Sequence, residues 1–440
     1  MKIERIALTV MAASLAMLAG IHSDAQVTRE KIGSDIYAAS GIYHLYKPGN
    51  MAETPAPEGY QAFYISHAGR HGSRYHTSLK DFAVVGGKLS AADSLGLLTP
   101  KGKALRSDLD RIYRASVGLD GELTERGAEE HRTIAARMYG RFPSVFKSPS
   151  RIYVDATSST VHRCQVSMLN FTGEIKKLNP NLKVNLRSGD SYQRSMLWKP
   201  SWFVKVMHIS DNLVDSLSRA WIDGSDFMNS VFTDREAADR IIGREDKFLR
   251  AVLIAGSIAP DLSMDDICVP GYFSEDERFA IAKLNSCRIY SSMVNAAESE
   301  GKRLCVIEGM LDDVIAKADA AVSRKSDVAA DLRFAHDASV MPLCGLIGIE
   351  GCSEPWHVEE VWKHWMTSDY TPMASNLQMI FYRKPGSKDI LVKFLLNEQE
   401  RAISALTPVS GPYYSWKDVR KHFLRRLDYA RSVLATMPAE

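Results

Sequence analysis

The chain has 440 residues, of which 45% are hydrophobic and 25% charged, a composition typical of a globular protein with a sizeable core. Lys and Arg nearly balance Asp and Glu, and the net charge of +2 gives no support to nucleic-acid binding, which needs a strongly basic surface. Six scattered cysteines, none in a CxxC pair, are too few for a disulfide scaffold and lack the pattern of a zinc finger. Cys344 and Cys352 are close enough in sequence to form a small disulfide loop.

The N-terminus has the layout of a secretory signal peptide. Basic residues precede an apolar run over residues 6–20, and Ser23 and Ala25 then form a small-x-small cleavage pattern. A membrane anchor is the alternative, but the run is shorter than the ~20 apolar residues that span a bilayer. We expect residues 1–25 to be removed, the mature chain to begin at Gln26 without a membrane span, and the protein to be secreted or periplasmic.

Three short apolar, β-prone runs each end in a polar stretch. Because ligands of open α/β sheets bind at the carboxyl ends of the strands, these stretches are expected to meet at one edge. The predicted strands cover residues 62–65, 152–154 and 332–335, and their polar ends are residues 66–70, 155–159 and 336–337.

Helical patterns fill much of the remaining chain. A helix is expected over residues 129–139, after the turn-like segment 124–127, whereas residues 26–60 read as an extended lead-in. Residues 176–325 read as mostly helical, with capping-box patterns at Thr233–Glu236 and Ser274–Glu277. Two β-prone runs flank a Pro-Gly turn and predict a hairpin; they cover residues 376–382 and 390–396.

These elements predict an α/β fold in two parts. The core is a mainly parallel sheet flanked by helices, and it is built from both ends of the chain, residues 26–175 and 326–440. A mostly α-helical insertion, or cap, domain over residues 176–325 lies between them.

The strongest functional signal is Arg70-His71-Gly72-Ser73-Arg74, directly after the first predicted strand. Phosphoryl transfer without a metal ion needs a nucleophile and fixed cations, because negative charge spreads over three non-bridging oxygens. His71 supplies a nitrogen lone pair, and Arg70 and Arg74 supply planar donor groups that match phosphate. Gly72 lets the backbone approach the ligand closely. An exposed basic turn is the alternative, but the position at a strand end favours a phosphoryl-transfer site.

The segment Ile65–Tyr75 resembles the signature of the histidine phosphatase superfamily, in the branch of acid phosphatases, phytases and multiple inositol polyphosphate phosphatases. Three further motifs follow in the family's order: Leu123-Thr-Glu-Arg-Gly127 is similar to its L-T-x-x-G helix start, Ser158-Ser-Thr-Val-His-Arg163 to its second phosphate-arginine motif, and Phe334-Ala-His336-Asp337 to its H-D motif. The resemblance covers about residues 60–175 and 325–400 and implies a phosphoglycerate mutase-like core.

The resemblance also implies a role for each matching residue. His71 would be the nucleophile that accepts the phosphoryl group, and Asp337 the acid that protonates the leaving alcohol. The phosphate-binding residues would be Arg70, Arg74, Arg163 and His336. The mechanism implied uses no metal and no cofactor, and its partner is a small phosphomonoester. His67 and His76, beside the motif, are expected to be structural.

The substrate is less closely specified. The segments Arg70–Thr77 and Phe334–Leu343 most resemble the inositol polyphosphate branch, which favours phytate. That branch usually carries H-A-E, whereas this chain has His336-Asp337-Ala338, the arrangement of classical acid phosphatases and many phytases. A highly phosphorylated ligand needs additional cations, and we expect them where the insertion begins; the candidates are Lys176, Lys177, Lys183, Arg187, Arg194, Lys199 and Lys205.

Parts of the sequence are also compatible with two other functions and with a metal site. A phosphomutase or bisphosphatase of the same superfamily would share the His71 chemistry, but the signal peptide disfavours it. An inactive phosphate-binding protein is an alternative of another class, which the complete set of motifs disfavours. His357, Glu360 and His364 have the spacing of a metal site on a helix, but an amphipathic helix with a polar face explains them better.

Overall fold

A computed structural model describes residues 27–49, 51–196 and 199–438. The signal peptide predicted for residues 1–25 lies outside them. Within these ranges, no helix is both long and apolar enough to cross a membrane.

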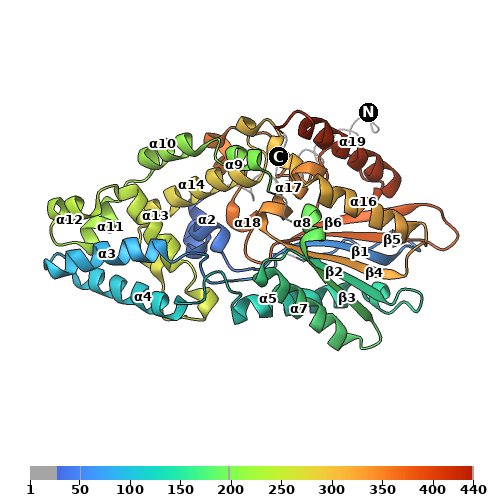
Figure 1. Cartoon of the computed structure of the whole chain (residues 1–440), viewed down its shortest axis with the longest axis horizontal. Coiled ribbons are helices and arrows are strands. Elements are labelled where there is room, and N and C mark those ends of the chain that lie inside the picture. The colour runs from blue at the N-terminus through green and yellow to red at the C-terminus, as the bar shows by residue number, and fades with distance from the viewer. Residues whose placement is uncertain (1–26, 50, 197–198, 439–440) are drawn as a thin grey trace, which may run out of the picture.

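The centre of the molecule is a twisted sheet of eight strands in the order β3-β2-β4-β1-β5-β6-β7, with β8 paired to β6 (Figure 1). The strands β3, β2, β4 and β1 run parallel, whereas β5, β6, β7 and β8 join by antiparallel pairing. Their bounds are β1 Gln61–Arg70, β2 Tyr153–Ser158, β3 Lys183–Ser188, β4 Val328–Ala335, β5 Asn376–Arg383, β6 Ile390–Leu396, β7 Gln399–Arg401 and β8 Tyr414–Ser415. The α/β fold is confirmed, with a mixed sheet rather than a mainly parallel one.

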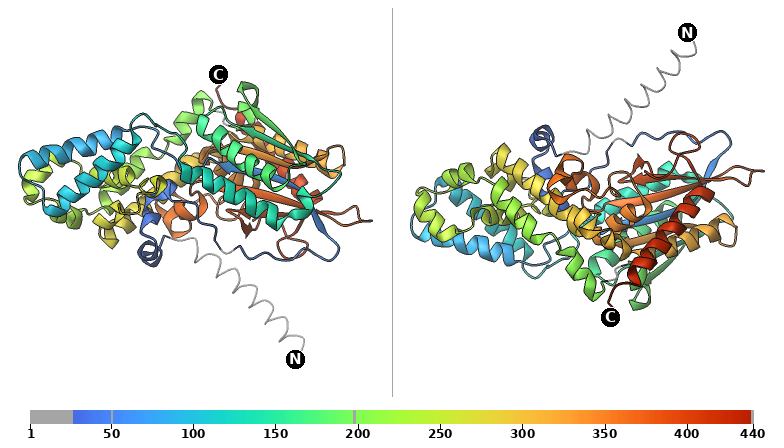
Figure 2. Two further views of the ribbon diagram at one scale, coloured as in Figure 1. Left: turned by 90° about the horizontal axis from the view of Figure 1, so that it is seen from below. Right: turned by 90° about the horizontal axis from the view of Figure 1, so that it is seen from above.

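Helices cover both faces of this sheet because neighbouring strand residues point to opposite sides. On β1, Tyr64 packs into one hydrophobic core and Ile65 into the other. The two views of Figure 2 show a different helical layer over each face. One layer is α5 Glu125–Arg141, α6 Pro143–Phe146 and α7 His162–Leu178; the other is α15 Lys302–Cys305, α16 Glu308–Val322, α17 Asp337–Ile347 and α19 Trp416–Leu434.

A second, purely helical lobe extends from one end of the sheet and gives the molecule its elongated shape (Figure 1). Two of its helices precede β2 in the chain, α3 Lys80–Ser94 and α4 Pro100–Ser116. They pack against α11 Ser225–Val231, α12 Arg235–Ile242 and α13 Glu245–Gly256 of the predicted insertion. The other helices of the insertion are α9 Ser201–Met207, α10 Asp211–Trp221 and α14 Glu275–Met293, and α14 contacts both α9 and α10.

The distribution of these elements bears on the predicted domains. The lobe takes α3 and α4 from the range assigned to the core, and the sheet takes β3 from the range assigned to the insertion. Segments from both sides of residue 175 therefore pack together in the lobe and in the sheet. The division of the chain into domains at residues 175 and 325 stays a prediction.

Several local predictions are confirmed. Thr124 caps α5 by accepting a hydrogen bond from the Gly127 amide. Ser274 and Glu277 form the expected capping box of α14. The hairpin of residues 376–396 is formed by β5 and β6.

Other local predictions were wrong. Residues 26–60 are not simply extended, since they contain α2 Arg29–Ser34 and the 3-10 segment η1 Ile36–Tyr43. The N-cap residue of α12 is Asp234 and not the predicted Thr233, which precedes it in the chain. Residues 358–363 form the 3-10 segment η6 rather than an amphipathic α-helix.

The remaining short elements connect the layers and are α8 Gln193–Met196, α18 Thr367–Tyr370, η2 Asp190–Tyr192, η3 Pro260–Leu262, η4 Val269–Tyr272 and η5 Ala297–Ser299. The disulfide suggested for Cys344 and Cys352 is absent, because all six cysteines are free thiols. Both side chains are fully buried beside each other, and burial, together with the neighbouring Cys344 thiol, holds the pKa of Cys352 above its ordinary value.

Candidate active site

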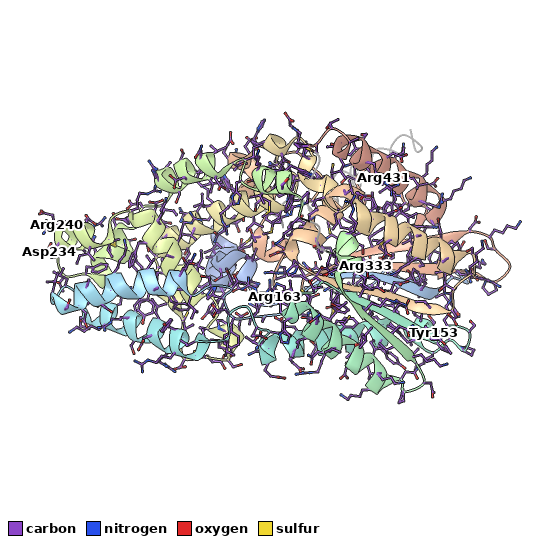
Figure 3. All side chains as sticks on the ribbon, in the orientation of Figure 1. Tyr153, Arg163, Asp234, Arg240, Arg333 and Arg431 are labelled. Atoms are coloured by element: carbon purple, nitrogen blue, oxygen red, sulfur yellow. The ribbon has the colours of Figure 1, made fainter. Side chains whose placement is uncertain are left out.

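The carboxyl ends of β1, β2 and β4 bring the sequence motifs together. Strands β1 and β4 are parallel neighbours in which Arg70 lies opposite Ala335, so that the residues after each strand emerge side by side. The His71 amide donates to the Ala335 carbonyl at 3.1 Å, and the Ser159 amide donates to the Phe334 carbonyl at 3.0 Å. Arg163, in the first turn of α7, lies where the sheet meets the helical lobe (Figure 3).

His71 is held in a single tautomer. Its Nδ1 lies 2.9 Å from the carbonyl oxygen of Gly72, which can only accept, so Nδ1 carries the proton and Nε2 keeps a lone pair. Burial, together with the charges of Arg70 and Arg74, holds the pKa of His71 well below its ordinary value. The imidazole is therefore neutral and nucleophilic even in acid.

Helix α5 fixes the backbone around this histidine by close packing. A Cβ atom on Gly72 would lie 2.4 Å from the Gly127 carbonyl oxygen, and one on Gly127 would lie 2.2 Å from the Ser73 carbonyl oxygen. Both glycines are therefore required for contact between the two segments. The Thr124 hydroxyl donates to the same Ser73 carbonyl at 3.0 Å. The L-T-x-x-G pattern thus builds the support of the His71 loop.

Glu130, also on α5, completes that support, although it belongs to none of the predicted motifs. Its carboxylate accepts hydrogen bonds from the Ser73 amide at 2.7 Å and the Ser73 hydroxyl at 2.9 Å. It also accepts from the Tyr46 amide at 3.2 Å, and all three residues are buried. The one available signal was that Glu130 stands three residues after Gly127, on the same helical face.

Three arginines present unpaired donors at this point. Arg70 is fully buried, and its Nη1 donates to the carbonyls of Ile42, Thr371 and Pro372 at 2.8–3.0 Å. Its Nε, and the Nε of Arg74 and of Arg163, are buried without a hydrogen-bond partner among the described residues, and its Nη2 forms only an ion pair with Asp337. Unpaired buried donors are costly, and a bound anion would satisfy several of them at once.

His336 and Asp337 face this cluster from the start of α17. His336 Nε2 lies 3.2 Å from the Ser159 hydroxyl, and its ring lies 5.5 Å from the His71 ring. Burial, helped by Arg163, lowers the pKa of His336 to about 3. Asp337 Oδ2 lies 3.2 Å from Arg70 Nη2, and Oδ1 accepts from the Ala338 amide at 2.8 Å.

The Asp337 carboxyl experiences opposing influences. Burial alone would raise its pKa, but the charge of Arg70, the neighbouring His336 and the Ala338 amide together lower it. Without a bound anion the group is therefore ionised, and a phosphate that shares Arg70 would raise its pKa again.

The structure thus brings all six predicted site residues to one point. Most of the basic residues predicted to bind further phosphates of the substrate instead form ion pairs or hydrogen bonds with other parts of the protein. Arg187 is ion-paired with Asp155 at 2.7 Å, Lys177 with Glu174 at 3.1 Å, and Arg194 with Glu308. Lys176 donates to the carbonyls of Pro180 and Leu182, just beyond the end of its own helix. Of the seven candidates, Lys199 is the one whose charge acts on His336.

The residues considered for a metal site are not gathered into one. His357 Nδ1 pairs with Glu298 at 3.1 Å, and the His364 ring stacks on Trp356 at 4.8 Å. Over the described ranges, no group of three or more His, Cys, Asp or Glu side chains is placed to hold a metal ion.

The family model of the histidine phosphatase superfamily, branch 2, matches residues 286–397 of the chain. This match contains His336 and Asp337, whereas His71 and the three arginines lie before it. Multiple inositol polyphosphate phosphatase 1 of Gallus gallus is 22% identical over 383 residues, covering 82% of this chain and 81% of that protein.

Solved structures share the fold. The Bifidobacterium longum multiple inositol polyphosphate phosphatase superposes with a TM-score of 0.69 at 19% identity, covering 87% of this chain and 97% of that one. The phytase from D. castellii gives a TM-score of 0.66 at 16% identity, covering 89% of this chain and 85% of that one.

Proposed function

We propose that this protein is a phosphomonoester hydrolase that transfers the phosphoryl group to His71, with inositol polyphosphates such as phytate as its substrates. The observation that carries the proposal is the fixed tautomer of His71, which leaves Nε2 with a lone pair beside guanidinium groups that keep N–H donors without a hydrogen-bond acceptor. A neutral nucleophile among cations has the composition that metal-free phosphoryl transfer needs.

In the first step, the Nε2 lone pair attacks phosphorus, and a nitrogen–phosphorus bond forms as the ester oxygen–phosphorus bond breaks. Arg70, Arg74, Arg163 and His336 bind the non-bridging oxygens. Asp337 gives its proton to the departing alcohol, because the bound phosphate has raised its pKa by adding negative charge and by sharing Arg70.

In the second step, water attacks the phosphohistidine. Asp337, now ionised, accepts a proton from that water while the oxygen–phosphorus bond forms and the nitrogen–phosphorus bond breaks. Inorganic phosphate leaves, and His71 regains its lone pair with Nδ1 still bonded to the Gly72 carbonyl.

We propose inositol polyphosphates as substrates because the similar proteins are named as inositol polyphosphate phosphatases and a phytase. A general acid phosphatase is the second candidate, because the H-D sequence at His336-Asp337 occurs in classical acid phosphatases as well as in many phytases. An inactive phosphate-binding protein is disfavoured by the presence of both a nucleophile and an acid.

Phosphate release separates these functions. Wild type is assayed on phytate, glucose 6-phosphate and p-nitrophenyl phosphate in the presence of EDTA, and release from phytate is expected to be efficient. Activity on the simple esters without any on phytate would favour a general acid phosphatase, and no release from any ester would favour a binding protein. The exposed variant Arg240→Gln, far from the site in Figure 3, serves as the control.

We further propose that the protein acts outside the cytoplasm, because residues 1–25 have the layout of a signal peptide. N-terminal sequencing of exported protein is expected to start at or near Gln26. Exported, active protein that retains Met1 would contradict this assignment.

A further inference from the structure

A carboxyl group of the helical lobe is buried against the helix that supports the His71 loop. Asp261 belongs to η3, which follows α13 in the chain and contacts α5. The residue is 1% exposed, and neither of its carboxyl oxygens has a hydrogen-bond partner of ordinary geometry among the described residues. A buried carboxylate without a donor is costly, and the group avoids that cost by binding a proton. The surroundings of Asp261 therefore favour its neutral form.

Asp261 also lies within reach of a second buried carboxyl group, that of Glu130 on α5. Burial, followed by the negative charge of Glu130, holds the pKa of Asp261 well above its ordinary value. The nearby Ser73 hydroxyl and the Arg74 guanidinium act in the opposite direction but do not cancel this rise. Two carboxyl groups that share a buried site do not both ionise readily. We therefore expect the pair to carry one proton.

The hydrogen bonds indicate that the proton is on Asp261. Glu130 accepts from the amides of Ser73 and Tyr46 and from the Ser73 hydroxyl. An ionised carboxylate only accepts hydrogen bonds, and donors that reach it favour its charged form. Burial raises the pKa of Glu130, and the bonds from Ser73 and Tyr46 counteract that rise. Glu130 is therefore the ionised member of the pair, and Asp261 is the neutral one.

The Ser73 hydroxyl can bond to both carboxyl groups at once. It donates its hydrogen to Glu130 at 2.9 Å, which leaves lone pairs of Ser73 Oγ free to accept. A protonated Asp261 can donate to that oxygen. An ionised Asp261 could only compete with Glu130 for the single hydroxyl hydrogen. The neutral form is thus the one that adds a bond to the loop without removing another.

The charge of Asp261 also matters to Arg74, the next residue of the loop. Arg74 Nη1 donates to the Tyr75 carbonyl at 2.9 Å, and its Nε has no hydrogen-bond partner in the described part of the chain. Its guanidinium carbon lies 5.2 Å from the Tyr43 ring. A carboxylate at Asp261 would attract this guanidinium and compete with a phosphate for it. A neutral Asp261 leaves Arg74 available to an anion.

We propose that Asp261 is a positioning residue, which stays protonated in the working enzyme and donates a hydrogen bond to Ser73 Oγ. It thereby helps to hold the loop that carries His71 and keeps Arg74 free for phosphate. It acts through Ser73 and not on the substrate itself. The inference rests on the proposed function and deepens it, because it adds a residue of the helical lobe to the support of phosphoryl transfer.

Two substitutions test the donor role. Asp261→Asn keeps the shape and an N–H donor but has no titratable proton, whereas Asp261→Ala removes the donor. At about pH 6, the Asn variant is expected to keep kcat/KM within about twofold of wild type, and the Ala variant to lose about tenfold, equally on phytate and p-nitrophenyl phosphate. Asp266→Ala removes an exposed carboxylate of the same segment, paired with Arg111, and is expected to match wild type. An Asn variant as impaired as the Ala variant, or a fully active Ala variant, would overturn the proposal.

Unfolding equilibria test the protonation state independently of turnover. Above about pH 4 the unfolded chain ionises Asp261, whereas the folded chain is expected to keep the proton. Wild type therefore loses stability relative to Asp261→Asn as the pH rises, by about tenfold in the unfolding equilibrium constant for each pH unit. Urea denaturation between about pH 4.5 and 7 is expected to show this divergence, and Asp266→Asn to follow wild type. Parallel curves for wild type and Asp261→Asn would overturn the proposal.

The urea curves also decide the matter if Asp261→Ala does not fold. If wild type releases no phosphate from any ester, the proposed function fails, whereas the protonation of Asp261 is still read from these curves.

Discussion

Arg70 Nη2 and Asp337 Oδ2 lie 3.2 Å apart, so the end of β1 and the first residue of α17 are joined by an ion pair inside the site. Arg70 is fully buried and anchored to three backbone carbonyls, so its position is fixed. A phosphate that binds Arg70 therefore arrives next to Asp337. This relationship couples anion binding to the protonation of the proposed acid.

Replacement of Asp337 by Asn removes the proton donor while keeping its shape. We expect kcat on poor leaving groups, such as inositol or sugar phosphates, to fall by about 10²–10⁴-fold. The loss on p-nitrophenyl phosphate is expected to be much smaller, because nitrophenolate leaves without protonation. Steady-state kinetics on both substrates checks this, and equal losses would exclude Asp337 as the acid.

The pH dependence of the rate is expected to follow from the pKa values of His71 and Asp337. Since the pKa of His71 is held well below its ordinary value, attack does not fail as the pH falls through 6.5. Asp337 must carry a proton in the substrate complex, so kcat is expected to decline as the pH rises, and Asp337→Asn is expected to flatten that decline. Initial rates are measured on protein shown to be folded by circular dichroism. A loss of rate centred near pH 6.5 on the acid side would contradict the neutral His71.

Glu130 is expected to position the catalytic loop through Ser73. Glu130→Ala leaves the buried amide and hydroxyl of Ser73 without acceptors, at a cost of about 1–3 kcal/mol for each group. We expect lower denaturation midpoints and a reduced kcat with little change in KM. Glu130→Gln retains an acceptor oxygen and is expected to recover much of both properties. A Gln variant as impaired as the Ala variant would show that the hydrogen bonds are not the cause.

A buried histidine makes the protein sensitive to acid. Both ring nitrogens of His131 lack hydrogen-bond partners among the described residues, and burial lowers the pKa of His131 to about 3. The folded state thus favours neutral His131. The unfolded state binds a proton at His131 below pH 6.5, whereas the folded state does so only near pH 3. The free energy of unfolding therefore falls by about 1.4 kcal/mol for each pH unit between these values.

His131→Leu tests this linkage. The free energy of unfolding is measured by urea denaturation between pH 7 and 4, and the variant is expected to lose less stability than wild type over that range. His208→Leu, which changes an exposed histidine, is the control. Parallel stability curves for wild type and His131→Leu would refute the assignment.

The parts of the site that the sequence predicts are those with a local pattern. Residues 70–74 and 336–337 each follow a strand, and parallel pairing of β1 with β4 makes their juxtaposition a consequence of topology. Thr124 and Gly127 were found from a helix-start pattern, although the reason for the glycine, its packing on Gly72, is visible only in three dimensions.

The missed features depend on contacts between distant segments. Glu130 and Ser73 are joined only once α5 packs on the loop. The prediction that Arg187 binds substrate failed for the same reason. The sequence did not reveal that β3 pairs with β2, which brings Arg187 into an ion pair with Asp155.

The measurement that tests the central claim most directly is the trapping of phosphohistidine. Enzyme mixed with excess substrate is quenched in alkaline detergent, which preserves a nitrogen–phosphorus bond, and the modified peptide is located by mass spectrometry. We predict phosphate on His71 in wild type, more of it under conditions that slow water attack, and none in His71→Ala, which is also inactive. Phosphate on another residue, or turnover by His71→Ala, would contradict the account.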